Sequence, residues 1–278
     1  MTPRELIRKT ASRFQAAGIP DPESDAALLL SHLTGRRPLD LRMDVDTELT
    51  SAVTAEYEDL VIQRLKRIPL QYLLGEAPFF RRIFLVDSRV LIPRPETELL
   101  CEWALELLTD LSAPSVLDLC TGSGCIGLTV KAERPDALVT LSDISRDALD
   151  VASANADRLS LVVALELKDL LDGFAASSFD LIVSNPPYIP AADCACLQPE
   201  VHHEPLLALL GGPDGCDLYR RIIRTAGPVL KPGGMLLMEL GIHESGILVP
   251  LLQSEGFTDI QIRQDYAGID RMILAVHP

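Results

Sequence analysis

Apolar side chains recur with a helical period at the start of the chain. Ile7, Ala11 and Phe14 stand at positions i, i+4 and i+7, the spacing that places them on one face of a helix. The run Thr2-Pro3-Arg4-Glu5 supplies an N-capping threonine, a proline at the first helical position and a capping-box glutamate. Gly18 is placed to end the helix. The pattern therefore predicts a first helix between Thr2 and Gly18.

Two more helices are predicted in the same region. One follows Asp21-Pro22 and turns residues 26–30 inward. The other occupies residues 49–66, with Val53, Tyr57 and Val61 on one side. Nothing in these helices indicates catalysis. We expect residues 1–70 to form a small helical bundle that recognises a substrate or supports a larger domain.

The pattern changes after residue 70. Short apolar runs at residues 78–80 and 83–86, separated by Arg81-Arg82, predict a β-hairpin that links two domains over residues 71–92. Pro93 and Pro95 then disfavour a helix until Pro95 and favour one that starts directly after it.

Strand and helix patterns alternate from residue 115 onward. This alternation predicts a mostly parallel sheet covered by helices on both faces, which is a doubly wound α/β domain over residues 93–278. The predicted strands are residues 116–119, 138–141, 161–165, 181–183, 235–239, 260–262 and 272–276.

Composition narrows the class of protein. The chain has 278 residues, of which 47% are hydrophobic, so one large or two modest domains can form a buried core. No apolar stretch reaches the ~18 residues of a membrane span, and no signal peptide is recognisable, so we expect a cytoplasmic protein without a membrane partner. None of the six cysteines forms a C-x-x-C pair, and we expect no metal site.

The charge argues against a nucleic acid partner. A net charge of −15 repels a phosphate backbone. One basic strip stands out within the acidic total, and we interpret its residues as solvated helix and hairpin edges: Arg64, Lys66, Arg67, Arg81 and Arg82.

A glycine-rich segment follows the first strand of the alternating region. In a doubly wound sheet this turn binds ligands, and glycines let the backbone approach a ligand closely. Gly122, Gly124 and Gly127 keep a G-x-G-x-x-G register, so the residues alone leave a dinucleotide and S-adenosylmethionine (SAM) both open. The candidate cofactor-binding residues of this loop are Cys120, Thr121, Gly122, Ser123 and Gly124.

Two acidic residues extend the candidate cofactor site. Asp143 ends the next strand, where a carboxylate can accept hydrogen bonds from both ribose hydroxyls of a nucleoside. Asp169 follows the third strand, where it is placed to accept from an adenine amino group while Leu170 packs on the ring.

The segment Asn185-Pro186-Pro187-Tyr188 follows the fourth strand of the alternating region, beside the cofactor loop. The prolines fix the backbone, so the Asn185 side-chain oxygen and a proline carbonyl become two fixed acceptors for the hydrogens of a planar NH₂ group. Tyr188 offers a face for stacking on that group. Such binding aims the nitrogen lone pair at a methyl donor. The four residues alone leave a nucleic-acid base and an amide open as acceptors.

With these motifs the chain resembles the release-factor glutamine methyltransferases, class I SAM enzymes with a Rossmann-like fold. These enzymes modify the glutamine of the Gly-Gly-Gln motif of class I peptide chain release factors. The resemblance covers nearly the whole length. Besides the Asn-Pro-Pro-Tyr motif it rests on the segments Leu91 to Glu98, Gly211 to Gly215, Leu218 to Arg220 and Gly268 to Arg271.

The resemblance implies SAM as cofactor and a release factor as protein partner. It implies that Cys120 to Gly124, Asp143, Leu170 and Asn185 contact SAM. The target glutamine would be held by Asn185 to Tyr188, with Asn185, Pro186 and Tyr188 in catalytic roles. Cys120 stands where many relatives have glycine, and Leu170 stands where some have tryptophan.

Two alternatives stay open on sequence. The first is a nucleic-acid methyltransferase that acts on adenine N6 or guanine N2, because the same four residues can hold the amino group of a flipped base. The second is a SAM-fold binding module without catalysis. For the release-factor methyltransferase we expect a monomer.

Overall fold

The computed structural model describes residues 1–278, which fall into two compact units. One unit comprises residues 1–76 together with residues 198–203, and the other comprises residues 77–197 and 204–278. The domain boundaries expected after residues 70 and 92 stay predictions.

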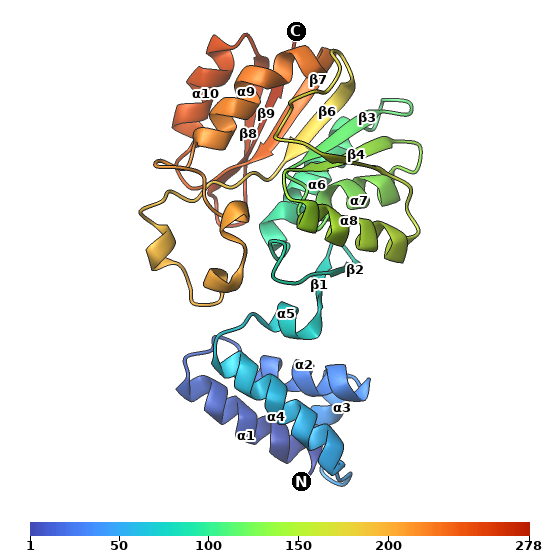
Figure 1. Cartoon of the computed structure of the whole chain (residues 1–278), viewed down its shortest axis with the longest axis vertical. Helices are drawn as coiled ribbons and strands as arrows, with labels where there is room; N and C mark the ends of the chain where they lie inside the picture. Colours follow the sequence, from blue (N-terminus) through green and yellow to red (C-terminus); the bar gives the residue numbers. More distant parts are fainter. The chain divides into compact units, whose positions relative to one another are not determined.

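The first unit is a helical bundle, as predicted (Figure 1, blue to cyan). Its first helix begins with the expected capping box, because Thr2 accepts a hydrogen bond from the Glu5 N–H and Glu5 accepts one from the Thr2 N–H. Phe14, Tyr57 and Val61 are fully buried in its core. Its helices are α1 (Pro3–Ala16), α2 (Pro22–Thr34), α3 (Pro38–Met43), α4 (Ser51–Leu65) and α5 (Leu70–Leu74).

Two of these helices were not predicted. Helix α3 has only six residues, too few for a clear apolar period. Helix α5 lies in the stretch assigned to the hairpin, and Gly75 ends it in the left-handed conformation at φ +72°. The hairpin is therefore shorter than predicted and comprises β1 (Glu76–Phe79) and β2 (Arg82–Leu85).

The interpretation of Arg64 as a solvated helix edge is wrong. Its side chain is buried in the first unit, where it donates to Asp25 at 2.8 Å and to Glu200 at 2.9 Å. Glu200 also accepts two hydrogen bonds from Arg67. Arg64 shares a face of α4 with Tyr57 and Val61, since these positions are three to seven residues apart. The basic strip is thus partly neutralised inside the protein.

The second unit contains the predicted α/β sheet. Its strand order is β5-β4-β3-β6-β7-β9-β8, with the first five strands parallel and the last two antiparallel to their neighbours. The strands are β3 (Ser115–Leu119), β4 (Leu138–Asp143), β5 (Ala164–Leu167), β6 (Phe179–Ser184), β7 (Leu230–Glu239), β8 (Thr258–Gln264) and β9 (Asp270–Val276). The helices are α6 (Pro95–Leu107), α7 (Cys125–Glu133), α8 (Arg146–Leu159), α9 (Asp217–Val229) and α10 (Ser245–Ser254), and three short 3₁₀ turns η1–η3 lie between residues 194 and 208.

Two apolar cores cover the two faces of the sheet. Alternate residues of one strand belong to different cores: Val116 packs with α6, α7 and α8, whereas Leu117 packs with α9 and α10. Figure 1 shows these two groups of helices on opposite faces of the sheet. The predicted doubly wound architecture, with its helical bundle and hairpin, is confirmed.

One predicted strand is displaced. Strand β5 begins at Ala164, three residues after the predicted start, because Leu161 caps the preceding helix. Ser160 adopts φ +55°, and the Leu161 N–H donates to the Ala156 carbonyl, as in a Schellman motif. Leu161 packs on the core below α8, so its apolar character reflects a helix end.

A buried hydroxyl in α7 gives a prediction for stability. Thr129 is fully buried and its Oγ1 has no hydrogen-bond partner. Thr129→Val keeps the shape and removes an unsatisfied polar atom, so we expect the free energy of unfolding to rise by about 1 kcal/mol. Urea unfolding of the two proteins measures this difference. A destabilised variant would mean that the hydroxyl has a partner in solution.

None of the helices combines the length and the apolar character that a membrane span needs. All six cysteines are free thiols.

Candidate active site

The two predicted loops leave the sheet side by side. Strands β3 and β6 are parallel neighbours, and Leu119 is paired with Ser184 in their register. The Ser184 hydroxyl also donates to the Leu119 carbonyl at 2.6 Å. Cys120 directly follows β3, and Asn185 directly follows β6. The strand order reverses between β3 and β6, and open α/β sheets bind ligands at the carboxyl ends of such strands.

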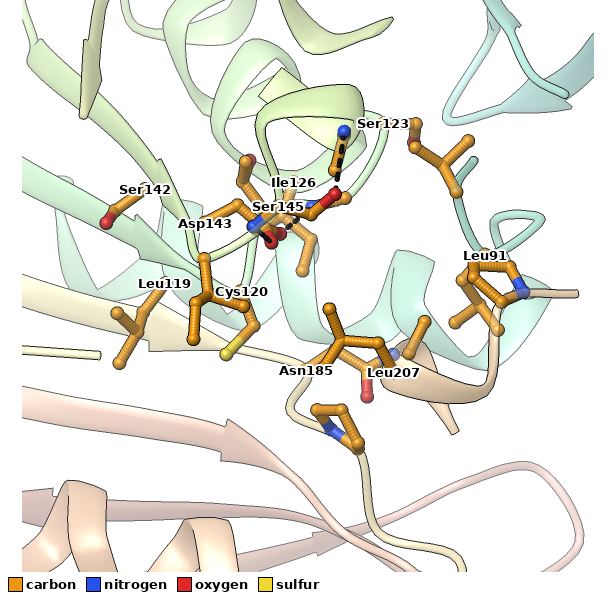
Figure 2. Close-up of a pocket in the computed structure, with 18 of the residues that line it drawn as sticks. Leu91, Leu119, Cys120, Ser123, Ile126, Ser142, Asp143, Ser145, Asn185 and Leu207 are labelled. Carbon is orange, nitrogen blue, oxygen red and sulfur yellow. Dashed lines mark hydrogen bonds between the residues drawn. The ribbon is translucent and has the colours of Figure 1, made fainter. Parts of the chain in front are cut away.

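A cavity of about 210 Å³ lies at this edge of the sheet. In Figure 2, Cys120 and Asp143 lie on one side of it and Leu91 lies on the other, with Asn185 between them. Three predicted site residues do not line the cavity: Gly124, Pro186 and Tyr188. The predicted residues that do line it are Cys120, Thr121, Gly122, Ser123, Asp143, Asp169, Leu170, Asn185 and Pro187.

The cofactor loop is held by Asp143. One carboxylate oxygen of Asp143 accepts from the Gly122 N–H at 3.0 Å, and the other accepts from the Ser145 N–H at 2.9 Å. Burial raises the pKa of this carboxyl. A side chain added at Gly122 would meet no atom within 4 Å, so the backbone there is open to a ligand. Each Asp143 oxygen keeps a lone pair for a ribose hydroxyl.

The second predicted acidic residue has a partner within the protein. Asp169 accepts a hydrogen bond from Arg221 at 2.8 Å, and both side chains are about half exposed at the cavity. Leu170 is buried, with φ +53°, and presents an apolar surface to the cavity. Leu170 thus offers an apolar surface to a planar ring, and Asp169 keeps lone pairs that can accept from an amino group.

Asn185 is held by two side chains, Thr97 and Glu239, that the sequence motifs did not predict. Its Nδ2 donates to Thr97 Oγ1 at 3.3 Å, and Thr97 Oγ1 donates to a carboxylate oxygen of Glu239 at 2.7 Å. Glu239 is fully buried at the end of β7, and burial raises its pKa to about 7. No N–H of the protein donates to Asn185 Oδ1, which is therefore free to accept from a ligand.

The Gly211 to Gly215 segment supports the backbone of Tyr188. An added Cβ at Gly211 would lie 2.7 Å from the Tyr188 Cα, and one at Gly215 would lie 2.5 Å from the Tyr188 carbonyl oxygen. The following residue, Ile189, exchanges two backbone hydrogen bonds with this region. Tyr188 itself is partly buried against α9 and β7, and burial raises the pKa of its hydroxyl. These glycines are therefore needed for close packing.

The proline-rich segment before α6 is fastened to the loop after η2. Glu204 is buried, and its two oxygens accept from the Ile92 N–H at 3.0 Å and from Arg94 at 2.5 Å. The same segment continues into Thr97, and Glu98 accepts from the Phe80 N–H of the hairpin. Leu91 and Leu207, which flank these contacts, line the cavity.

Three buried carboxyls make stability depend on pH. Burial raises the pKa of Asp118, Glu239 and Glu244 to about 7, above their ordinary values of 3.8 and 4.5. Between these values the folded protein holds protons that the unfolded chain has released. We therefore expect the free energy of unfolding to fall as the pH rises from about 5 to about 8, by up to about 1.4 kcal/mol per pH unit for each group.

Urea unfolding at four pH values across this range measures the slope. Hydrogen bonds from arginine lower the pKa of Asp136 and of Asp214 to about 2. These carboxylates therefore stabilise the folded protein above about pH 4, and this stabilisation is lost as the pH falls further. A free energy of unfolding that stays constant or rises between pH 5 and 8 would contradict the burial of these acids.

A doubly wound sheet with a ligand cavity at its switch point, and an amide acceptor beside a glycine-rich loop, defines a methyltransferase with a Rossmann-like fold. Residues 97–197 match the family model "Methyltransferase small domain", and residues 5–75 match "PrmC N-terminal domain". The fold is also similar to that of the T. thermophilus 16S rRNA N2 G1207 methyltransferase in complex with AdoMet and guanosine. The TM-score is 0.53 at 20% identity, over 73% of this chain and 50% of that one.

Curated relatives identify the family. The chain is 42% identical to the release factor glutamine methyltransferase of Chlorobaculum tepidum, over 96% of this chain and 94% of the relative. It is 40% identical to the enzyme of the same name from Deinococcus radiodurans, over 98% of this chain and 97% of the relative. The chain belongs to the release factor glutamine methyltransferase family, and the resemblance drawn from its motifs is confirmed.

Proposed function

We propose that the protein transfers the methyl group of SAM to the side-chain amide nitrogen of the glutamine in the Gly-Gly-Gln motif of peptide chain release factors. The observation that carries this proposal is that Asn185 lines the cavity directly beside the cofactor loop and that its Oδ1 accepts no hydrogen bond within the protein. The relatives are named for a glutamine of release factors, so the nucleic-acid alternative is not favoured.

The cavity residues fit SAM by chemistry. Asp143 suits ribose hydroxyls, Leu170 suits an adenine ring, and the open backbone at Gly122 leaves room for the rest of the molecule. The carboxylates also suit a positively charged sulfonium. SAM, when bound, supplies a methyl group whose bond to sulfur breaks as a bond to the amide nitrogen forms.

Asn185 Oδ1 and the Pro186 carbonyl accept the two hydrogens of the glutamine amide, which holds the nitrogen lone pair toward the cofactor loop. Tyr188 packs against the amide plane. Both acceptors also stabilise the positive charge that develops on nitrogen during transfer. The nitrogen then releases a proton to water, so no dedicated base is needed. Pro186 and Tyr188 lie outside the cavity lining, and in this proposal they act on the acceptor.

The test is methyl transfer from labelled SAM to purified release factors, with the wild-type Gly-Gly-Gln loop and with its glutamine replaced by alanine. We expect label in the first protein alone. DNA and RNA incubated at low salt form a further arm, and label there would support the amino methyltransferase instead. The proposal includes a monomer in the cytoplasm, for which gel filtration and cell fractionation are the checks.

A further inference from the structure

Three side chains from three separate elements form a hydrogen-bonded chain that ends at the acceptor site. Thr97 belongs to α6, Glu239 ends β7, and Asn185 follows β6. The Thr97 hydroxyl has one proton, and at 2.7 Å from Glu239 it donates that proton to the carboxylate. Thr97 Oγ1 can then only accept from Asn185, so the NH₂ end of the Asn185 amide faces Thr97. The oxygen end is left for the substrate.

We propose that Thr97 and Glu239 are positioning residues that set which end of the Asn185 amide faces the acceptor nitrogen. This inference rests on the proposed function, in which Asn185 Oδ1 accepts a hydrogen of the glutamine NH₂ group. An ionised Glu239 can only accept hydrogen bonds, which fixes the productive orientation.

Protonation of Glu239 reverses the direction of the hydrogen bonds that connect it, through Thr97, to Asn185. A protonated carboxyl donates to Thr97 Oγ1, which frees the Thr97 proton to point toward Asn185. That proton favours the Asn185 oxygen on the Thr97 side and the NH₂ group on the substrate side. Two NH₂ groups then face each other, and the substrate loses an acceptor. Methyl transfer therefore requires Glu239 as a carboxylate.

The surroundings of Glu239 place this change near neutral pH. Burial raises its pKa to about 7, and Arg271 on β9 opposes this effect. A hydrogen bond from the Asn185 amide also lowers the pKa. The other titratable groups that act on Glu239, or on which it acts, are Glu96 and Cys101 of α6, Cys125 of α7, Tyr188 after β6 and Tyr219 of α9.

The experiment is the pH dependence of kcat for methyl transfer to a release factor at saturating SAM. For the wild-type protein we expect kcat to fall about ten-fold between pH 8 and pH 6, as the fraction of ionised Glu239 falls. Glu239→Gln removes the titrating proton, so its kcat should be lower at pH 8 and constant across this range. A Glu239→Gln protein that keeps the wild-type profile would overturn the inference.

Glu244→Gln is the matched control, because Glu244 is the other buried glutamate with a pKa near 7, and it accepts instead from the Gly241 N–H. This variant should retain the decline of kcat at low pH. If kcat of Glu244→Gln no longer fell at low pH, the titrating carboxyl would be Glu244 instead of Glu239, and our proposal would be rejected.

Substitutions at Thr97 test the hydroxyl without changing a charge. Thr97→Val should lower kcat about ten-fold at pH 8. Thr97→Ser keeps the hydroxyl, so its kcat and its pH dependence should match those of the wild-type protein. Thr129→Val makes the same isosteric change at a buried hydroxyl outside the site, and its kcat should equal that of the wild-type protein. Urea unfolding of Thr97→Val checks that this variant is folded. Equal kcat in Thr97→Val and wild type would count against a positioning role. If Glu239→Gln does not fold, Thr97→Val and Thr97→Ser still test the positioning role.

Failure of the proposed function gives a different result. If the wild-type protein transfers no methyl group to a release factor at any pH, the proposed function is wrong. If it does transfer methyl groups, and the profiles of the variants do not change, only the positioning role is wrong.

Discussion

Replacing Asn185 with alanine is expected to lower kcat by about 10²- to 10³-fold, the cost that is typical for the loss of one preorganised hydrogen-bonding group in an active site. Alanine has no oxygen to accept from the glutamine NH₂ group, so the nitrogen is held by one fixed acceptor instead of two. The lone pair then loses its direction, and the developing charge loses a stabilising dipole. Radioactive methyl transfer at saturating SAM measures kcat.

SAM binding separates this effect from a damaged cavity. The cofactor contacts of the loop after β3 and of Asp143 remain in Asn185→Ala, so calorimetric SAM affinity should stay close to that of the wild-type protein. Ser184→Ala is a neighbouring control that removes the bond to the Leu119 carbonyl but keeps the acceptor oxygen. Losses of equal size in SAM binding and turnover would show that Asn185 holds the cofactor and not the acceptor.

Gly211→Ala should lower kcat by about 10²-fold, although residue 211 does not line the cavity. The new Cβ would lie 2.4 Å from the Gly215 carbonyl oxygen and 2.7 Å from the Tyr188 Cα. Both are backbone atoms, so the loop that carries Asn185 to Tyr188 must move. Overpacking of this kind also costs about 1–3 kcal/mol of stability. Steady-state kinetics and urea unfolding measure the two effects.

Gly246→Ala is the matched control for that substitution. Gly246 lies in the first turn of α10, and an added Cβ there would meet no atom within 4 Å. Alanine in a helix is favourable, so this variant should keep its activity and lose no stability. Wild-type activity in Gly211→Ala would mean that the Gly211 to Gly215 segment does not set the position of the acceptor loop.

The sequence was sufficient to predict the adjacency of the two central loops. Cys120 and Asn185 each follow an apolar strand, and parallel strands end at the same edge of a sheet, so local patterns were enough. The backbone conformation at Cys120 could not be predicted from the sequence. Cys120 adopts φ +59°, a conformation that glycine reaches without strain, so a glycine would fit the same backbone at this position.

The network around Asn185 could not be predicted in this way. Thr97 and Glu239 are 142 positions apart, and their contact depends on β7 pairing with β6 and on α6 packing against β7. A glutamate at the carboxyl end of a strand was a usable signal, but nothing local connects it to a threonine in another helix. The prediction that Arg64 is solvated was wrong for a similar reason, since its partner Glu200 is far away in the sequence.

The separation between Thr97 and Glu239 has a consequence for biosynthesis. Every residue of the cofactor loop and of the acceptor loop has been synthesised once the ribosome passes Tyr188, whereas Glu239 emerges about fifty residues later. Until β7 joins the sheet, the Thr97 hydroxyl has no carboxylate partner and the Asn185 amide is free to rotate. A nascent or truncated chain that ends before β7 can therefore contain both loops without the carboxylate that orients the acceptor amide, so we expect full methylation activity only when the domain is complete.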